Sequence, residues 1–312
     1  MTENIAVKPL KKRPANKLQR RKAVTMYLFL LPSIIGFLWF TVYPVGRSLY
    51  MSLFNWNIQG PQEYVGLANY KHIFTTDKVF PLVVIATVKF AVYSIVSGLF
   101  LSFVMALLLN SKRRSVGFFR TMFYLPCMIA GGAPTIVMWA YIFAPDGLVN
   151  TFLKNFGITG PNWLTSVQFA LPAIVIMSLW GAGGAMIIFI AGLRSVPVEY
   201  YESADIDGAS YFRKLFKITL PVMSPVILYN LLMGVIGALQ VFGQSYLLTD
   251  GGPMNTTRFW VLYIFGSAFN AFRFGYASAL AWVLFAIILV LSVLIFNTGA
   301  RWVFYGDNQK GN

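Results

Sequence analysis

The sequence is poor in charged residues, acids above all, and it has almost no cysteine or histidine. Only 11% of its 312 residues are charged, whereas an average soluble domain has about a quarter. A single cysteine, Cys127, excludes an internal disulfide, and a single histidine, His72, excludes a histidine cluster, so no metal site is evident. Together with a hydrophobic content of 57%, the scarcity of charge indicates a polytopic membrane protein.

Other absences narrow the functional class. The chain contains no Gly-Lys dipeptide and so no G-x4-G-K-[ST] phosphate-binding loop, and we do not expect it to bind ATP in that way. No catalytic constellation is evident, so we do not expect an enzyme. The net charge of +15 is concentrated at the ends of the apolar runs, which argues against nucleic-acid binding.

Six apolar runs are long enough to cross a bilayer, for which roughly 20 residues are needed. They lie at 23–46, 81–109, 121–143, 167–193, 222–248 and 274–300. A seventh run, 259–272, has only 14 residues, which predicts a re-entrant or interfacial helix. No Asp or Glu falls inside a predicted span, which disfavours a proton relay and a cationic substrate. The predicted fold is an all-α polytopic membrane protein with six transmembrane helices.

Six crossings place both termini on the same side of the membrane. That side carries 18 of the 25 Lys and Arg residues, so the positive-inside rule predicts cytoplasmic termini in a multi-pass protein of the cell membrane. The expected parts are a basic cytoplasmic tail at 1–22, an additional N-terminal helix at 23–46, an external loop at 47–80, a core at 81–300 with a cytoplasmic loop at 194–221, and a cytoplasmic tail at 301–312. We expect the basic tail to contact anionic membrane lipid.

Residues 199–221 form the only long charged segment between apolar runs, with four acids and three bases. We predict a helix capped by Ser195, with Pro197 in its first turn, that ends at a left-handed Gly208. A second helix is predicted over 210–217. From these residues alone, a solvated loop and a docking site for a cytoplasmic partner fit equally well.

The same segment carries a recognisable pattern. The motif E-A-A-x3-G-x9-I-x-L-P is matched by Glu202, Ala204, Gly208, Ile218, Leu220 and Pro221, and the sequence departs from it only at Ser203, where the motif has alanine. It resembles the coupling loop of the inner-membrane permeases of binding-protein-dependent ABC importers. Residues 65–70 (VGLANY) and 248–257 (LTDGGPMNTT) resemble the GLxNY and LTxGGPxxxT segments of the permeases for carbohydrates such as maltose, glycerol-3-phosphate and multiple sugars.

The resemblance implies a MetI-like (type I) importer transmembrane domain with an additional N-terminal helix. It implies three kinds of partner: a second, similar permease in a heterodimer, two ATPase subunits and an extracytoplasmic solute-binding protein. Membrane lipid, expected from the basic tail, is a fourth. ATP and Mg would be bound by the ATPase subunits, so no cofactor is expected on this chain. Glu202 would face the ATPase and Gly208 would permit the turn, while Ile218, Leu220 and Pro221 would anchor the loop to the following span.

The implied function is a permease subunit that forms half of the pathway for a sugar or oligosaccharide. An importer for glycerol-3-phosphate or a polyol is the alternative, and a secondary transporter is a weaker one, because it would need intramembrane acids and internal repeats. Sugars bind amides, hydroxyls and aromatic faces, which makes pathway candidates of Trp180, Gly181, Gly184, Asn230, Gln240 and Gln244. Helix packing is the alternative for the small residues at 181–185, and hydrogen bonding between helices is the alternative for Gln240 and Gln244, four apart on one predicted helix face.

Overall fold

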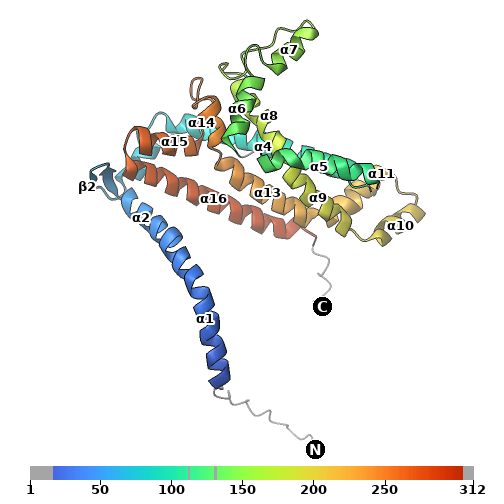
Figure 1. Ribbon diagram of the computed structural model, residues 1–312, viewed down its shortest axis with the longest axis horizontal. Helices are drawn as coiled ribbons and strands as arrows, with labels where there is room; N and C mark the ends of the chain where they lie inside the picture. Colours follow the sequence, from blue (N-terminus) through green and yellow to red (C-terminus); the bar gives the residue numbers. More distant parts are fainter. Residues whose placement is uncertain (1–16, 112, 130–131, 305–312) are drawn as a thin grey trace, which may run out of the picture.

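The computed structural model of the protein describes residues 17–111, 113–129 and 132–304. The two predicted tails, 1–22 and 301–312, therefore lie largely outside the described residues. Within the described part, the regular secondary structure is helical except for one hairpin of two short strands. Figure 1 shows a bundle of long helices from which the first helix departs.

Four helical segments of this part are long and apolar enough to cross a membrane without a sharp bend. The first is Val24–Ser52, which includes most of α1 (Lys17–Phe37) together with η1 (Leu38–Val42) and α2 (Tyr43–Ser52). The second is α4 (Phe80–Leu108), and the fourth is α16 (Phe274–Trp302). The third, Ala170–Ser195, joins α8 (Ala170–Leu179), η2 (Trp180–Ala182) and α9 (Gly183–Ser195). The number rises to six if each of two bent helix pairs is one span. The predicted fold class, an all-α membrane protein, is confirmed.

The third predicted span, 121–143, is not a straight crossing. It consists of α5 (Arg114–Ile129) and α6 (Ala133–Ile142), whose axes differ in direction by 107°. Pro134 occupies the first turn of α6 after an extended Gly132, a position where proline starts a helix. Beyond α6, the short helix α7 (Leu148–Asn155) projects from the bundle (Figure 1).

The fifth predicted span, 222–248, is also wrong as a continuous helix. Helix α13 (Ser224–Leu239) ends at Gln240, and a separate helix, α14 (Gly243–Leu248), follows. Helix α14 packs against α6 and buries Ser245, whose hydroxyl donates to the carbonyl of Thr257. Tertiary contacts therefore redirect an apolar run that by composition alone would continue as one helix.

The core of the bundle is built around α4, which packs against α8, α9 and α13. Helix α16 packs against α13 and α2. Small residues permit close approach: a Cβ at Gly192 of α9 would lie 3.0 Å from the Val226 side chain of α13. One apolar cluster, including Phe90, Phe259 and Leu280, fills one end of the bundle, and a second, including Phe189 and Met223, fills the other.

The VGLANY segment fixes the hairpin to the bundle. Strand β1 (Phe54–Asn57) pairs antiparallel with β2 (Gly60–Tyr64), and α3 (Ala68–Thr75) follows. The Asn69 amide donates to the backbone carbonyls of Ser52 and Phe54, at 2.8 and 3.1 Å, and the Tyr70 hydroxyl lies 2.8 Å from the Ser52 hydroxyl. The asparagine and tyrosine of this segment therefore hold the end of α2 against α3.

The run 259–272 forms two short helices rather than a crossing. They are α15 (Trp260–Phe265) and η4 (Gly266–Asn270), and neither belongs to a candidate span. The backbone N–H of Trp260 donates to Thr87 of α4 at 3.0 Å, and its indole N–H donates to the carbonyl of Leu280 of α16 at 3.1 Å. We call α15 and η4 together the α15–η4 wedge. Its two short helices agree with the predicted re-entrant or interfacial helix.

Asp77 joins the start of α4 to this wedge. Its carboxylate accepts hydrogen bonds from the backbone N–H groups of Val79 and Phe80 and from the hydroxyls of Tyr263 and Tyr276. Burial raises the pKa of Asp77, but these hydrogen bonds stabilise the carboxylate more strongly, and the pKa lies below its ordinary value. One carboxylate thus ties together three segments of the bundle end opposite to the loop 199–221.

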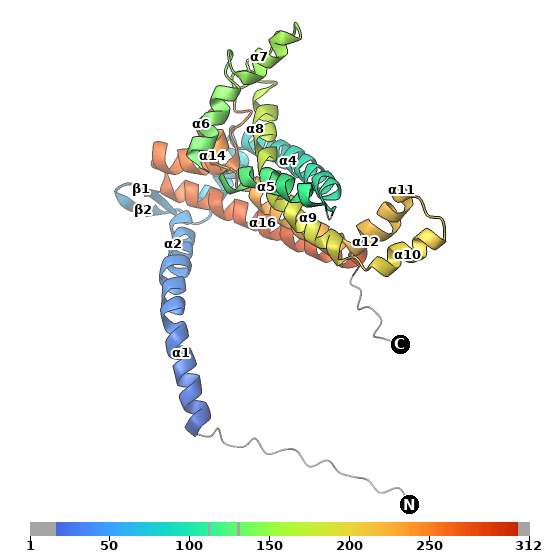
Figure 2. The same cartoon turned by 45° about the vertical axis from the view of Figure 1, so that its right-hand side comes forward.

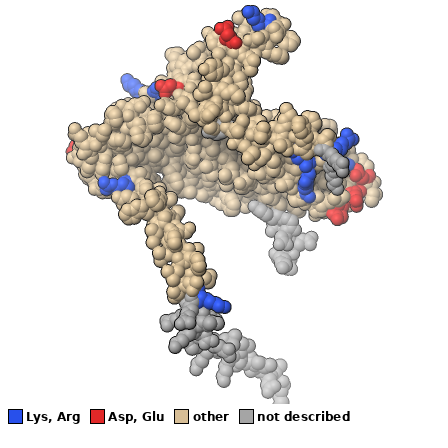
Figure 3. All heavy atoms as spheres, in the orientation of Figure 1, with Lys and Arg blue, Asp and Glu red and all other residues tan. Residues whose placement is uncertain are grey.

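The distribution of charge along the bundle fits a membrane-embedded protein. Figure 3 shows blue and red side chains at the two ends and on the projecting α7 segment, with an uncharged middle. The first span leaves the bundle, as Figure 2 shows from a second direction, and no part of its most apolar window is buried. Its side chains therefore face lipid or another chain.

Candidate functional site

The charged segment folds into an elbow of two helical arms at one end of the bundle (Figure 2). The first arm, α10 (Val198–Ile206), ends in two hydrogen bonds typical of a Schellman cap: Ala209 N–H to Ala204 C=O at 2.9 Å, and Gly208 N–H to Asp205 C=O at 3.1 Å. Gly208 has φ of +68°, the left-handed conformation predicted for it.

The predicted start of this arm is wrong. Ser195 is the last residue of α9, and its hydroxyl donates to the carbonyl of Gly192 at 2.8 Å. Helix α10 begins only after Pro197, which has extended ψ of 135° and makes no side-chain cap. Val196 is buried in the bundle and holds the chain extended there, so the arm starts later than the sequence pattern predicts.

The second arm runs back into the bundle. It comprises α11 (Tyr211–Lys214), η3 (Leu215–Thr219) and α12 (Leu220–Val222), a longer stretch than the predicted 210–217. The Ser210 hydroxyl caps its start by accepting from the N–H of Arg213 at 3.5 Å. At Met223 the chain bends by 67° into α13.

Two side-chain contacts join the arms to each other. The Tyr201 hydroxyl of α10 lies 2.8 Å from the Thr219 hydroxyl, and Lys214 forms a salt bridge of 2.6 Å with Asp205. Tyr201 also packs, with Ile218, against the buried cluster that contains Met223. The elbow is therefore one unit rooted in the bundle rather than a loose loop.

The motif residues divide between the surface and the root of the elbow. Glu202, Ser203, Gly208 and Pro221 are exposed, and Ala204, Ile218 and Leu220 are half-buried. Large apolar side chains are exposed beside the acids: Ile206 (88% of its surface accessible), Tyr211, Phe212 and Phe216. An apolar surface with acidic residues, held on a rigid base, has the character of a docking surface for another protein.

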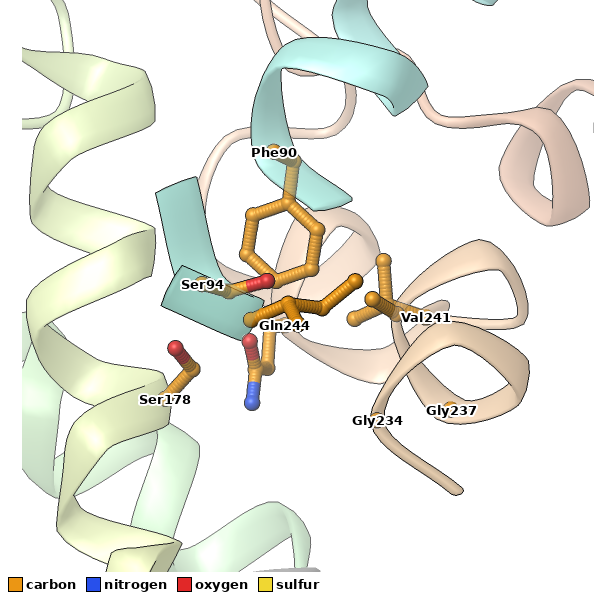
Figure 4. A pocket seen from close by; sticks show the side chains of 9 residues that line it. Phe90, Ser94, Ser178, Gly234, Gly237, Val241 and Gln244 are labelled. Carbon is orange, nitrogen blue, oxygen red and sulfur yellow. The ribbon is translucent and has the colours of Figure 1, made fainter. Parts of the chain in front are cut away.

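Two adjoining cavities, both open to the surroundings of the chain, lie between α4, α8, η2, α13 and α14. The first, of about 230 Å³, is lined by Gln244, Ser94, Ser178 and Phe90, among others, and Figure 4 shows Gln244 beside the two serines. The carboxamide oxygen of Gln244 is buried and has no hydrogen-bond partner in the described chain. A buried acceptor without a partner next to a cavity suits a hydroxyl donor from a ligand.

The second cavity, of about 360 Å³, lies further along α4, away from its first residue. It shares Ser94 and Ser178 with the first and adds Gly181, Tyr229 and Asn230. Asn230 is 6% exposed, and its amide donates to the carbonyl of Val226 at 2.9 Å, which leaves its carbonyl oxygen available. The two cavities together offer hydroxyls, two amides and aromatic faces, and no charged side chain lines either of them.

The structure thus brings together three of the six predicted pathway residues: Gly181, Asn230 and Gln244. Gly184 faces α5 instead, where a Cβ would lie 3.2 Å from the Cys127 sulfur. Gln240 is the exposed C-cap of α13, so it does not share a helix face with Gln244, contrary to the prediction. Trp180 packs edge-on against Trp139, with ring centroids 5.6 Å apart, and lines neither cavity.

The sequence reasoning missed the serines. Ser94 and Ser102 of α4 and Ser178 of α8 meet at the cavities. Hydroxyl residues within apolar helices are a weak signal, because most of them bond to a carbonyl of their own helix, as Ser178 does with Val175 at 2.6 Å. Only the packing distinguishes serines that line a cavity from serines that do not.

Comparison with known families gives a match over most of the chain. The family described as "Binding-protein-dependent transport system inner membrane component" matches residues 98–303. This range contains the elbow and most residues that line the two cavities.

Individual relatives cover nearly the whole chain. The sequence is 36% identical to "Probable ABC transporter permease protein YesP" of Bacillus subtilis, over 93% of this chain and 95% of the relative. It is 34% identical to "Lactose transport system permease protein LacF" of Rhizobium radiobacter, over 90% and 96%. The fold matches a chain of a bacterial alginate ABC transporter crystallised with an alginate pentasaccharide-bound periplasmic protein, with TM-score 0.78, 24% identity, and 92% and 98% coverage.

Proposed function

The chain belongs to the family of binding-protein-dependent transport system inner membrane components, and on this basis we propose that it forms half of an ATP-driven import pathway for a sugar or oligosaccharide. The family is a transport permease component, and the chain itself is a membrane-integral permease. What we propose beyond this concerns the partner subunits, the substrate and the orientation of the chain in the membrane.

The elbow is the observation that carries the proposal. It presents Glu202 and a group of exposed apolar side chains on a base fixed in the bundle. The chain has no phosphate-binding loop of its own, so the energy of transport enters from elsewhere. Two ATPase subunits that bind ATP and Mg dock on the elbow of this chain and on that of a second, similar permease.

The elbow transmits movement because it is rigid and its root lies in the bundle. The Tyr201–Thr219 contact and the Lys214–Asp205 salt bridge keep its arms together. A displacement of the elbow therefore acts on α9 and α13, to which the arms are joined at Val196 and Met223. Because α13 lines both cavities, such a displacement changes their shape and access.

The orientation follows from the same assignment. ATPase subunits act in the cytoplasm, so the elbow and both termini lie on the cytoplasmic side, in agreement with the distribution of Lys and Arg. The opposite end, with the hairpin and α15, faces outward and receives substrate from a solute-binding protein. The alginate transporter of matching fold was crystallised with such a periplasmic protein.

The chemistry of the two cavities supports an uncharged polar substrate. Sugar hydroxyls find partners in the amides of Asn230 and Gln244 and in the hydroxyls of Ser94 and Ser178. The lactose permease LacF, a relative over nearly the whole chain, is named for a neutral sugar. Glycerol-3-phosphate would require a cation, which these cavities lack; Lys89 lines a separate cavity of about 510 Å³ nearer the start of α4.

The experiment that tests the proposal is gentle purification of the chain from its native membrane, followed by mass spectrometry of the proteins that elute with it. We expect an ATPase with a Walker A motif and a second permease. Recovery of the chain alone in several mild detergents, with transport that persists after ATP depletion, would instead indicate a secondary transporter.

We expect Gln244→Leu to lower sugar uptake while leaving the stability of the protein unchanged or slightly higher. The substitution removes a buried acceptor that has no partner, so the folded state loses no hydrogen bond, whereas the substrate loses one. One such bond is worth about 1 kcal/mol, or roughly a fivefold change in affinity. Uptake as a function of sugar concentration measures the effect, and Gln240→Leu, at the exposed C-cap, is the matched control.

A further inference from the structure

A separate cavity of about 310 Å³ lies at the end of the bundle opposite to the elbow. It is lined by the loop after α14, by α15 and by the η4 segment that leads into α16, and its polar side chains are Asp250, Arg258, Tyr263, Ser267, Asn270 and Arg273. None of these residues belongs to the two cavities described above. Two guanidinium groups in one cavity are an arrangement suited to an anion.

Both arginines are held in place without being neutralised. Arg273 stacks on the ring of Tyr276, with 4.5 Å from the guanidinium carbon to the ring centroid. Arg258 packs on the backbone of Gly251, where a Cβ would lie 3.1 Å from its side-chain Nε. In the described part of the chain, neither guanidinium forms a salt bridge or a side-chain hydrogen bond.

The charge of the lining matches a single negative charge. Two arginines and one carboxylate, Asp250, leave one net positive charge. The nearby Asp77 accepts hydrogen bonds from Tyr263 and Tyr276 and does not line the cavity. A phosphodiester, which carries one negative charge and accepts forked hydrogen bonds from arginine, complements this site.

The position of the cavity connects it with the membrane surface. Arg273 directly precedes Phe274, the first residue of a membrane span, so it lies at the boundary between hydrocarbon and water. Phe269 and Phe272 lie in the same stretch of chain, 266–273, that lines the cavity, and 58% and 46% of their surfaces are accessible. Phe272 has φ of +53°, which is unusual for a bulky residue. The residues on either side of it are held by backbone hydrogen bonds, from Ala271 N–H to Gly266 C=O and from Arg273 N–H to Ser267 C=O.

From this juxtaposition of paired arginines and exposed phenylalanines at the end of a span, we propose that the cavity binds the phosphodiester of an anionic phospholipid from the leaflet on the side opposite to the elbow. The guanidinium groups of Arg258 and Arg273 bind the phosphate oxygens, the Asn270 amide donates to a remaining oxygen, and the acyl chains lie along Phe269 and Phe272. A bound lipid would brace the α15–η4 wedge against α16.

The test is lipid retention by the full-length protein, purified from bilayers of phosphatidylcholine and phosphatidylglycerol in equal amounts and examined by native mass spectrometry. We expect retained phosphatidylglycerol on the unchanged protein and about a tenfold loss of it on R258Q/R273Q, since each guanidinium supplies a charge-assisted hydrogen bond. R258K/R273K should retain an intermediate amount because lysine keeps the charge but not the fork.

Arg47→Gln is the matched control, because Arg47 is also an arginine that stacks on aromatic rings, those of Tyr50 and Trp56, away from this cavity. The proposal is overturned if R258Q/R273Q retains as much phosphatidylglycerol as the unchanged protein, if phosphatidylcholine is retained equally well, or if R47Q causes the same loss. An unchanged melting temperature and an unchanged elution volume in size-exclusion chromatography establish that the variants are folded. Lipid retention is measured without transport, so its outcome is independent of the proposed import function.

Discussion

Gly208→Val should reduce sugar uptake at least tenfold while leaving the amount of protein in the membrane unchanged. Gly208 adopts φ of +68° in the cap between the two arms of the elbow. The left-handed conformation costs a residue with a Cβ about 1–2 kcal/mol, and β-branched residues are especially disfavoured there. At about 2 kcal/mol the population of the native turn falls by more than tenfold relative to competing conformations, and the ATPase partner that we propose loses a fixed docking surface.

The protein should still fold, because a Cβ at Gly208 meets no atom within 4 Å. Uptake of labelled sugar and substrate-stimulated ATP hydrolysis, at equal expression, are the measurements. Gly208→Asn is the matched control, since asparagine tolerates the left-handed conformation, and it should retain most of the activity. Normal uptake by the valine variant would remove the elbow from the mechanism.

The second large effect is expected at Gly183, the first residue of α9, where α5 crosses. A methyl group there would overlap the carbonyl oxygen of Phe123 and would lie 3.0 Å from both its carbonyl carbon and the Cα of Tyr124. These are backbone atoms, so no rotamer change relieves the overlap. We expect Gly183→Ala to cost about 3 kcal/mol, at the upper end for overpacking, and to lower the melting temperature and the yield of assembled complex.

Gly181, two residues earlier, provides the matched comparison, because a Cβ at this glycine would meet nothing within 4 Å. Gly181→Ala should leave stability unchanged, and Gly181→Val, which extends into the second cavity, should lower uptake without unfolding the protein. Differential scanning fluorimetry of the purified complex separates the two positions. Equal melting temperatures for Gly183→Ala and Gly181→Ala would contradict the close crossing of α5 and α9.

The sequence determined the class of the protein and the place of its most informative segment. Apolar runs long enough to cross a bilayer, separated by the few charged residues, predict an all-α membrane protein, and this prediction is confirmed. The turn at Gly208 was also predictable, because glycine is favoured where the backbone must adopt positive φ. The membrane class and the turn at Gly208 both depend on the chemistry of residues that are close together in the sequence, so the sequence alone predicts them.

The tertiary structure decided what the apolar runs themselves do. The run predicted at 222–248 carries no charge, yet it breaks at Gln240, and the helix that follows, α14, packs against α6. In the same way, buried Val196 keeps the chain extended and delays the start of the first elbow arm. In a membrane span nearly every residue is apolar, so periodicity carries little information about which face meets another helix.

The two cavities between the helices were likewise decided by the tertiary structure. Gln244, Asn230 and Ser178 lie on three different helices, α14, α13 and α8, and only the packing of the folded bundle brings them to the two adjoining cavities. Gln240 has the same side chain as Gln244 but lies exposed at a helix end. A polar residue in an apolar run must find a partner, yet the sequence does not say whether that partner is its own helix, a neighbour or a substrate, because this depends on the distance between helices that meet only in the folded protein.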